Sequence, residues 1–303
     1  MPTSRRHSSS APVGDLASAL VARGAIYADA GYRAGGWAVA QAIEDVARLR
    51  AHIVTRFGAP KRVVLIGESM GGVIGLALLE REPSRYQGGV AFCSGTIGAY
   101  DYFKRGAFDP LVMFEALFPS VLPPADNVPA SFRPSEEAVG SVLKALRGDP
   151  NRAAIVQRAA SLPDIPSVAE MLVLHLDAVR ELSVRAGGNP FDNSRTEYPG
   201  LVRDGKPIAA VRRVKSVPAA ERYLRQFYTP TGRLRVPFLA VNVKSDPVVP
   251  IWATDGYPRA NQYFVQQYVD GAGHCGVTKD QRMAAFGALQ GWMDRGRRPA
   301  HLR

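Results

Sequence analysis

Cysteine and histidine are scarce in this 303-residue sequence, which contains two cysteines and five histidines. Two cysteines cannot build a disulfide-rich scaffold, and they exclude a zinc site made of cysteines alone. No apolar run approaches the roughly 20 residues that a membrane-spanning helix needs. We therefore expect no stable insertion into a membrane.

A secretory signal is also missing from the sequence as written. Its first ten residues, MPTSRRHSSS, contain paired arginines, but the APVGDLASAL that follows is too polar and short for the apolar part of such a signal. The sequence predicts a cytoplasmic protein, or an extracellular one if an upstream segment has been lost.

Acidic residues are outnumbered, because 27 Asp and Glu stand against 38 Lys and Arg, a net charge of +11. Clustered basic residues bind nucleic acid by neutralising phosphates. Here the arginines are scattered, and the densest groups are the C-terminal RGRRPAHLR and Arg212, Arg213 and Lys215. We interpret the excess as a solvated basic surface and expect no nucleic-acid partner.

One stretch, VVLIGESMGG at residues 63–72, places Glu68 and Ser69 between glycines directly after four apolar residues. The pattern G-x-S-x-G is typical of a nucleophile elbow, a sharp turn that lifts a serine hydroxyl above a sheet. We expect Gly67 and Gly71 to lie where a side chain would collide with neighbouring backbone. The alternative is a glycine-rich turn without chemical consequence.

The surroundings of the motif favour the elbow. Residues 62–66 are predicted to form a buried strand, and residues 73–79 continue as an apolar helix. This strand, turn and helix are the setting that the motif requires. In such a turn the N–H of Met70 faces the oxyanion that develops at a substrate carbonyl.

A nucleophilic serine needs a base, and the base needs an orienting acid. His52 and His175 fall in predicted helices and His301 in the C-terminal tail, which leaves His7 and His274. Only His274 lies in a glycine-rich turn, DGAGHCG, directly after the strand-like YFVQQYVD. A rigid scaffold can aim a histidine in that place.

An aspartate between the serine and this histidine is the candidate acid. Residues 236–243 form an apolar, β-branched run that predicts a buried strand, and Asp246 follows in a turn fixed by Pro247. An Asx-type turn alone would explain an aspartate before proline. However, the order Ser69, Asp246, His274 is the triad order of α/β hydrolases, and each residue follows a predicted strand.

The chain resembles α/β hydrolases, and among them bacterial serine esterases related to feruloyl esterases and lipases. The motifs that carry the resemblance are GESMGG around Ser69, SDPVVP around Asp246 and GAGHCG around His274. It implies a mostly parallel sheet flanked by helices. It also implies that this triad cleaves a small-molecule carboxylic ester through an acyl-enzyme, with Met70 as an oxyanion donor and without a metal or organic cofactor.

The step from His274 to Cys275 also resembles the tannase and feruloyl-esterase pattern, in which a cysteine beside the serine bridges one beside the histidine. The sequence departs from that pattern because Glu68 precedes the serine. Cys93 is the only other cysteine. A Cys93–Cys275 disulfide and two buried free thiols both stay open at this point.

Strands and helices alternate through the first part of the chain. We expect a helix at residues 15–23, a strand at 25–30, a long helix at 37–57 and, after the elbow, a strand at 86–93. This alternation predicts an α/β protein with a parallel sheet. The hydrophobic content of 46% is sufficient for a sizeable core.

After Cys93 the alternation stops. Residues 95–235 contain few strand candidates, although a β-α-β unit needs only about 30 residues or somewhat more. We expect a helical cap here, with helices at 135–147, 152–161, 168–185 and 219–227. The hydrolase core is then formed by residues 1–94 and 236–303.

Several residues near the elbow are candidates for substrate contact. Aromatic side chains gather in AYDYFKRGAFDPLVMFEALFP, residues 99–119, and either roof over the substrate or pack the cap onto the core. Glu68, beside the nucleophile, either contacts the substrate or is solvated. The candidates for substrate binding are Glu68, Tyr102, Phe103, Phe114 and Phe118.

The N-terminal part is shorter than the resemblance implies. An α/β-hydrolase core has three strands before the helix predicted at residues 15–23, and the loop after the third supplies the second oxyanion donor. The fourteen preceding residues are too few and too polar for strands of about 5 to 6 residues each. We expect shortened N-terminal strands, an exposed edge at residues 25–30, and self-association through that edge.

Two other functions are compatible with the same motifs. An acyltransferase would use the triad but exclude water, and a catalytically silent protein would use the cap as a receptor pocket. An intact triad favours an enzyme, because a silent protein does not need all three groups. The sequence predicts a serine carboxylic-ester hydrolase, with an acyltransferase as the nearest alternative.

Overall fold

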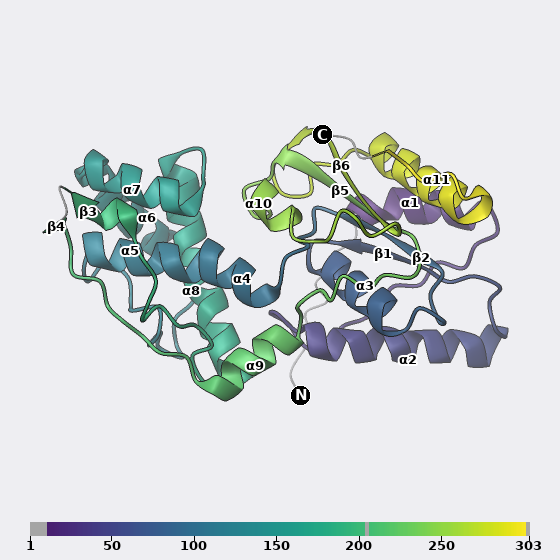
Figure 1. Ribbon diagram of the computed structural model, residues 1–303, viewed down its shortest axis with the longest axis horizontal. Coiled ribbons are helices and arrows are strands. Elements are labelled where there is room, and N and C mark those ends of the chain that lie inside the picture. The colour runs from purple at the N-terminus through teal and green to yellow at the C-terminus, as the bar shows by residue number, and fades with distance from the viewer. Residues whose placement is uncertain (1–10, 204–205, 301–303) are drawn as a thin grey trace.

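The computed structural model describes residues 11–203 and 206–300, which form two parts (Figure 1). One part is a sheet with helices on both faces, and the other is made mainly of helices. The described chain begins in the sheet part, enters the helical part after β2 and returns to the sheet with β5.

Within the described residues, the sheet contains four parallel strands in the order β1-β2-β5-β6. They are β1 (Val64–Glu68), β2 (Gly88–Phe92), β5 (Phe238–Ser245) and β6 (Phe264–Ala272). Every residue of β2 is buried, as expected for an inner strand of a parallel sheet that is covered on both faces. The α/β class and the parallel sheet predicted from the sequence are confirmed.

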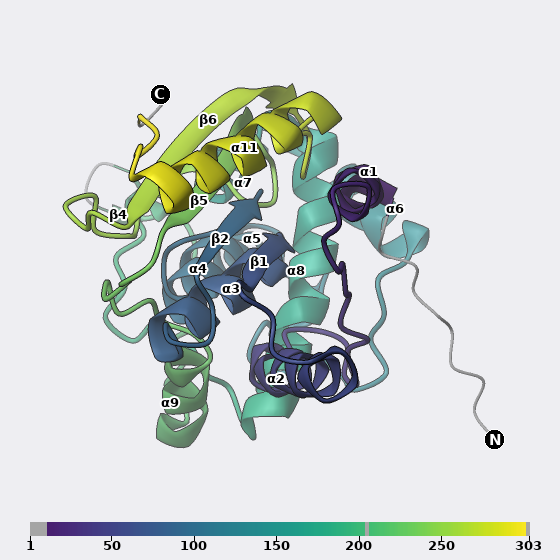
Figure 2. The same cartoon turned by 90° about the vertical axis from the view of Figure 1, so that its right-hand side faces the viewer.

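Helices cover the two faces of the sheet (Figure 2). On one face α3 (Met70–Arg81) packs against β1 and β2, and α2 (Val39–Phe57) packs against α3. On the other face α11 (Lys279–Arg295) packs against β2 and β5, with α1 (Ala11–Val21) beside it. Each face has its own buried hydrophobic cluster, and the strands lie between the two.

The strand expected at residues 25–30 is absent, and that prediction is wrong. The backbone there has no regular structure, and Ile26 is 61% exposed. A strand needs a neighbour to satisfy its backbone groups and to cover its side chains. Among the described residues β1 pairs with β2 alone, so the outer strand on this side is β1. Self-association through this side of the sheet stays a prediction.

The helical part has a separate hydrophobic cluster, built from buried residues between Ala99 and Leu224. The four helices predicted from residue 135 onward are confirmed to within a few residues, whereas the exact domain boundaries stay a prediction. The elements are α4 (Ala99–Phe103), the π-helix η1 (Lys104–Phe108), α5 (Asp109–Leu117), α6 (Glu136–Gly148), α7 (Pro150–Ala160), α8 (Ile165–Ala186), the 3-10 helix η2 (Pro199–Leu201), β3 (Val202–Arg203), β4 (Lys206–Pro207) and α9 (Pro218–Gln226).

Local signals in the sequence set the ends of these helices. The side chains of Ser135 and Asp164 accept hydrogen bonds from the first turns of α6 and α8, and Gly187 ends α8 with a φ of +75°. In the sheet part a short helix, α10 (Ile251–Thr254), follows β5. No helix within residues 11–203 and 206–300 has the length and apolar character needed to cross a membrane.

Glu80 of α3 anchors the chain where it returns from the helical part. Its carboxylate accepts hydrogen bonds from the hydroxyl of Tyr257 (2.6 Å), the N–H groups of Thr231 (2.8 Å) and Arg233 (3.0 Å), and the hydroxyl of Tyr228. Burial opposes ionisation of Glu80, but the hydrogen bonds outweigh it and hold the pKa of this carboxyl below its usual value.

We expect Glu80→Gln to lower the free energy of unfolding by roughly 1–3 kcal/mol at neutral pH, because an amide replaces a charged acceptor. The pKa of Glu80 is lower in the folded state, so its stabilisation is present above the unfolded-state pKa. That stabilisation is lost as the pH falls through the folded-state pKa, and the difference from wild type should shrink in acid.

Urea unfolding at neutral pH and at about pH 3 measures this change. Glu170→Gln is the control, because Glu170 is exposed on α8. A difference of equal size at both pH values would contradict the assignment of Glu80 as an ionised acceptor.

Candidate active site

Ser69 lies on a sharp turn between β1 and α3. Its backbone has a φ of +50° and a ψ of −121°, a conformation that non-glycine residues rarely adopt. The Ser69 N–H donates to the carbonyl oxygen of Phe92 at 2.9 Å, which holds the turn against the end of β2. The strand, turn and helix that the motif predicts are present.

The glycines around Ser69 are required at one predicted position and not at the other. A Cβ on Gly67 would lie 2.3 Å from the carbonyl carbon of Gly71, so no side chain fits there. Gly71 itself faces open space, and the prediction for it is wrong. The steric demand falls on Gly72, because α3 turns this residue toward Ser94, whose Cβ would lie 2.5 Å from the added atom.

Asp246 follows β5, and its side chain is fully buried. Oδ1 accepts hydrogen bonds from the N–H groups of Val248 and Val249, each at 2.9 Å. The carboxylate also faces Nδ1 of His274, at 3.0 Å from Oδ2 and 3.1 Å from Oδ1. The Asx-type turn and the contact with histidine, which the sequence presents as alternatives, therefore occur together.

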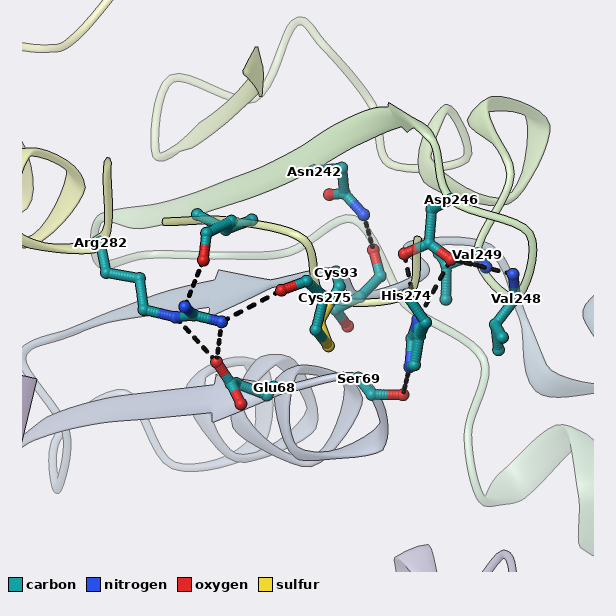
Figure 3. Close-up of a disulfide and its surroundings, with 12 residues drawn as sticks. Glu68, Ser69, Cys93, Asn242, Asp246, Val248, Val249, His274, Cys275 and Arg282 are labelled. Carbon is teal, nitrogen blue, oxygen red and sulfur yellow. Dashed lines mark hydrogen bonds and ion pairs between the residues drawn. A yellow bond between two sulfur atoms is a disulfide. The ribbon is translucent and has the colours of Figure 1, made fainter. Parts of the chain in front are cut away.

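His274, in the loop after β6, connects this carboxylate to the serine (Figure 3). Its Nε2 atom lies 3.0 Å from Oγ of Ser69. When Nδ1 carries the proton and donates to Asp246, the lone pair on Nε2 faces the serine hydroxyl. The arrangement can take a proton from Ser69 and return it to a leaving group, which is what nucleophilic catalysis requires.

The structure contains the Cys93–Cys275 disulfide, which decides the alternatives that the sequence leaves open. It links the end of β2 to the residue directly after His274. The two sulfur atoms lie close to a ring nitrogen of His274, a grouping of metal-ligand type. It does not fit a metal site, because the sulfurs are bonded to each other and both ring nitrogens face Ser69 and Asp246.

Glu68 has a partner that the sequence analysis missed. Its Oε1 atom accepts from Nε of Arg282 at 2.9 Å, and the pair is largely shielded from solvent. The expectation of a solvated side chain is therefore wrong. Arg282 lies on the apolar face of α11, in line with Phe286 and Leu289. A cation at that position in an amphipathic pattern is the signal that could have revealed it.

Tyr102 and Phe103 lie where the helical part meets the sheet part. The hydroxyl of Tyr102 donates to the carbonyl oxygen of Val248 at 2.6 Å, and so supports the turn that holds Asp246. Burial and the nearby Asp246 carboxylate raise the pKa of Tyr102. The ring of Phe103 packs edge-on against Tyr102 and Trp37, with centroid distances of 5.0 and 4.9 Å.

Phe114 and Phe118 lie deeper in the helical part. Their rings stack on each other at 5.3 Å, and both side chains are buried in its hydrophobic cluster. These contacts match the packing interpretation of the aromatic stretch. Contact of Glu68 and of the four aromatic candidates with a substrate stays a prediction.

The boundary between the two parts also contains a cavity of about 660 Å³. Its lining includes Thr96, Lys104, Arg105, Thr229 and Trp252, and does not include the three triad residues. Trp252 stacks on Tyr102 with the ring centroids 6.0 Å apart. The ring of Tyr102 therefore lies between this wall of the cavity and the turn that holds Asp246.

The remaining histidines do not join this site. His52 is exposed on α2, and burial in α8 lowers the pKa of His175 to about 4. His7 and His301 lie outside the described residues.

Residues 21–150, less than half of the chain, match the family described as serine aminopeptidase, S33 (Hydrolase_4). No curated protein matches the sequence. The match agrees with the parallel sheet and the elbow, and the chain has the α/β-hydrolase fold.

Solved structures that resemble the chain include three hydrolases of low sequence identity. A 2-hydroxy-6-oxo-6-phenylhexa-2,4-dienoate hydrolase from a Rhodococcus species is 16% identical over 85% of this chain and 70% of that one, with a TM-score of 0.36. A pyrethroid hydrolase from Sphingobium faniae is 18% identical over 93% and 91%, with a TM-score of 0.39. An esterase from Thermogutta terrifontis is 14% identical over 88% and 74%, with a TM-score of 0.38.

Replacing both cysteines, Cys93→Ala with Cys275→Ala, is expected to lower the free energy of unfolding by about 2–5 kcal/mol. The reason is that the disulfide joins positions 182 residues apart and restricts the unfolded chain. Urea unfolding of the oxidised protein and the variant measures the change. A thiol reductant should reproduce the loss in wild type and leave the double variant unchanged, and an insensitive wild type would contradict the prediction.

Proposed function

We propose that this protein, which has the α/β-hydrolase fold, cleaves carboxylic esters through an acyl-enzyme formed on Ser69. The observation that carries the proposal is the continuous chain of hydrogen bonds from Asp246 through His274 to Ser69. A serine hydroxyl alone is a weak nucleophile, and a base within hydrogen-bond distance activates it.

In the first half of the reaction, Oγ of Ser69 attacks the ester carbonyl while Nε2 of His274, 3.0 Å away, takes the hydroxyl proton. The imidazolium then gives this proton to the oxygen of the leaving alcohol. In the second half, His274 takes a proton from water as the water oxygen attacks the acyl carbonyl. The imidazolium then returns this proton to Oγ of Ser69 as the bond between Oγ and the acyl carbon breaks and the acid leaves. Asp246 fixes the orientation of the ring and stabilises its charged form.

The N–H of Met70 is the proposed oxyanion donor. Met70 is the first residue of α3, and Ser69 precedes the helix without capping it through its side chain. The first N–H groups of a helix have no intrahelical acceptor, and the helix dipole adds a partial positive charge there. This end of α3 is therefore suited to the negative charge that develops on the carbonyl oxygen.

Three classes of substrate distinguish the candidate reactions. Water as acceptor gives hydrolysis, whereas an added alcohol that outcompetes water would indicate an acyltransferase. Because the matched family is described as serine aminopeptidase, amino-acid p-nitroanilides belong in the comparison. A panel of p-nitrophenyl esters of increasing acyl length, methyl hydroxycinnamates and p-nitroanilides, with and without an added alcohol, separates these reactions.

We expect Ser69→Ala to lower kcat for p-nitrophenyl acetate by at least about 10⁴-fold, because only oxyanion and binding effects remain. Asp246→Asn should cost about 10⁴-fold as well, since an amide favours the wrong tautomer of His274. Stopped assays of released p-nitrophenol measure both losses, and circular dichroism checks the fold. Ser141→Ala, at an exposed position of α6, is the matched control. Wild-type turnover by Ser69→Ala would show that Ser69 is not the nucleophile.

A further inference from the structure

Arg282 of α11 is a buried cation beside the proposed active site, with 5% of its surface exposed. Its Nε donates to Oε1 of Glu68 at 2.9 Å, and Nη2 lies 2.6 Å from the same oxygen in the ion pair. Nη2 also donates to the carbonyl oxygen of Cys275 at 3.3 Å, and Nη1 donates to that of Val277. The ring of Phe92 covers the guanidinium, with its centroid 5.5 Å from Cζ.

These partners belong to the two turns that carry the proposed nucleophile and base. Glu68 directly precedes Ser69, and Cys275 directly follows His274. Figure 3 shows Arg282 on one side of the disulfide, reaching both turns, while the bond between Ser69 and His274 lies on the other side. One side chain thus connects two segments that are far apart in the sequence, since Glu68 and Cys275 are 207 positions apart.

We propose that Arg282 and Glu68 are positioning residues, whose ion pair sets the distance between Nε2 of His274 and Oγ of Ser69. The proposal rests on the function proposed above for those two groups. Neither Arg282 nor Glu68 touches the reacting atoms, so both act through the turns that they hold.

Stability alone does not explain a buried ion pair at this place. Desolvation of two charges offsets much of their attraction, and apolar residues of similar volume are often equally stable. A guanidinium instead restricts the orientation of its partners. Its N–H groups lie in one plane at fixed angles, so a carboxylate and neighbouring carbonyl groups must take one orientation to hydrogen-bond with them. Orientation matters here, since a displacement of about 1 Å in an active site can cost about 100-fold in rate.

The disulfide does not make this ion pair redundant. Cys275 is held through its sulfur to Cys93, at the end of β2, and through its carbonyl oxygen to Arg282. The contact of His274 with Asp246 and the hydrogen bond from the N–H of Gly273 to the carbonyl oxygen of Ser245 tie the loop to the end of β5. Arg282 adds a tether in another direction, toward the turn after β1 that carries Ser69.

The decisive variant combines Arg282→Met with Glu68→Gln, because it removes both charges and leaves no ionised group buried without a partner. Two rates are measured: hydrolysis of p-nitrophenyl acetate, and labelling by a fluorophosphonate, in which Oγ of Ser69 attacks phosphorus and fluoride leaves. We expect kcat and the labelling rate to fall by about 10- to 100-fold. KM should change by less than about threefold, because the variant leaves the contacts that bind the substrate in its ground state unchanged.

Two further variants separate positioning from general stability. Arg282→Lys keeps the charge but loses the fork of donors, and should recover part of the lost rate. The control is Arg62→Met with Asp294→Asn, which removes an exposed ion pair of 2.6 Å between the chain before β1 and α11. It should react at the wild-type rates, since it contacts neither turn.

The labelling rate distinguishes the two proposals. A folded Arg282→Met, Glu68→Gln variant that is labelled as fast as wild type would overturn the positioning role. If that variant does not fold, a folded Arg282→Lys with the wild-type labelling rate would overturn it equally. A wild type that is labelled but hydrolyses no ester would overturn the ester proposal alone, and an unlabelled wild type would overturn both.

Discussion

The hydrogen bond between His274 and Ser69 joins the two outer strands of the described sheet, and much of the structure bears on it. β1 and β6 lie three strand spacings apart, about 14 Å for a parallel sheet. The residues after β6 must therefore extend back across the ends of β5 and β2 before His274 reaches Ser69. Asp246 at the end of β5 and Cys93 at the end of β2 lie along this route, and each contacts the crossing segment.

The loop that crosses this edge is held by backbone hydrogen bonds, among them that from the N–H of Gly273 to the carbonyl oxygen of Ser245 at 3.2 Å, and also by side chains. The buried carboxylate of Asp246 orients the ring, the disulfide fixes the neighbouring residue, and Arg282 connects that residue to the turn after β1. Gly276 allows the return of the loop, since a Cβ there would lie 2.1 Å from the carbonyl oxygen of Ala272. The loop thus packs closely on itself in addition to being held by Asp246, the disulfide and Arg282.

The sequence predicted the features that depend on short stretches of chain. Ser69, Asp246 and His274 each follow a predicted strand, and the parallel arrangement brings such positions to one edge. Prediction from the sequence failed where a feature depends on a residue or strand that is distant in the chain. Residues 25–30 have strand-like composition but no neighbouring strand, and the conformation of such a segment is decided by tertiary contacts rather than by propensity.

Arg282 and Gly72 were missed for a related reason. The local sequence of α11 contains no sign of which distant carboxylate meets Arg282, and the crowding at Gly72 comes from Ser94, on another strand end. The pairing of Cys93 with Cys275 stayed open because burial alone suits a thiol and a disulfide equally. Through-space contacts of this kind become visible only when the fold is known.

The disulfide encloses the helical part completely, since α4 through α9 all lie between Cys93 and Cys275 in the chain. The sheet on either side of this insertion is built from two separate stretches of chain, before residue 93 and after residue 237. A protease that cuts a surface loop of the helical part would therefore leave two fragments that stay covalently joined beside the proposed base. The strands would keep their parallel pairing. The two fragments would separate on a denaturing gel only after the disulfide is reduced.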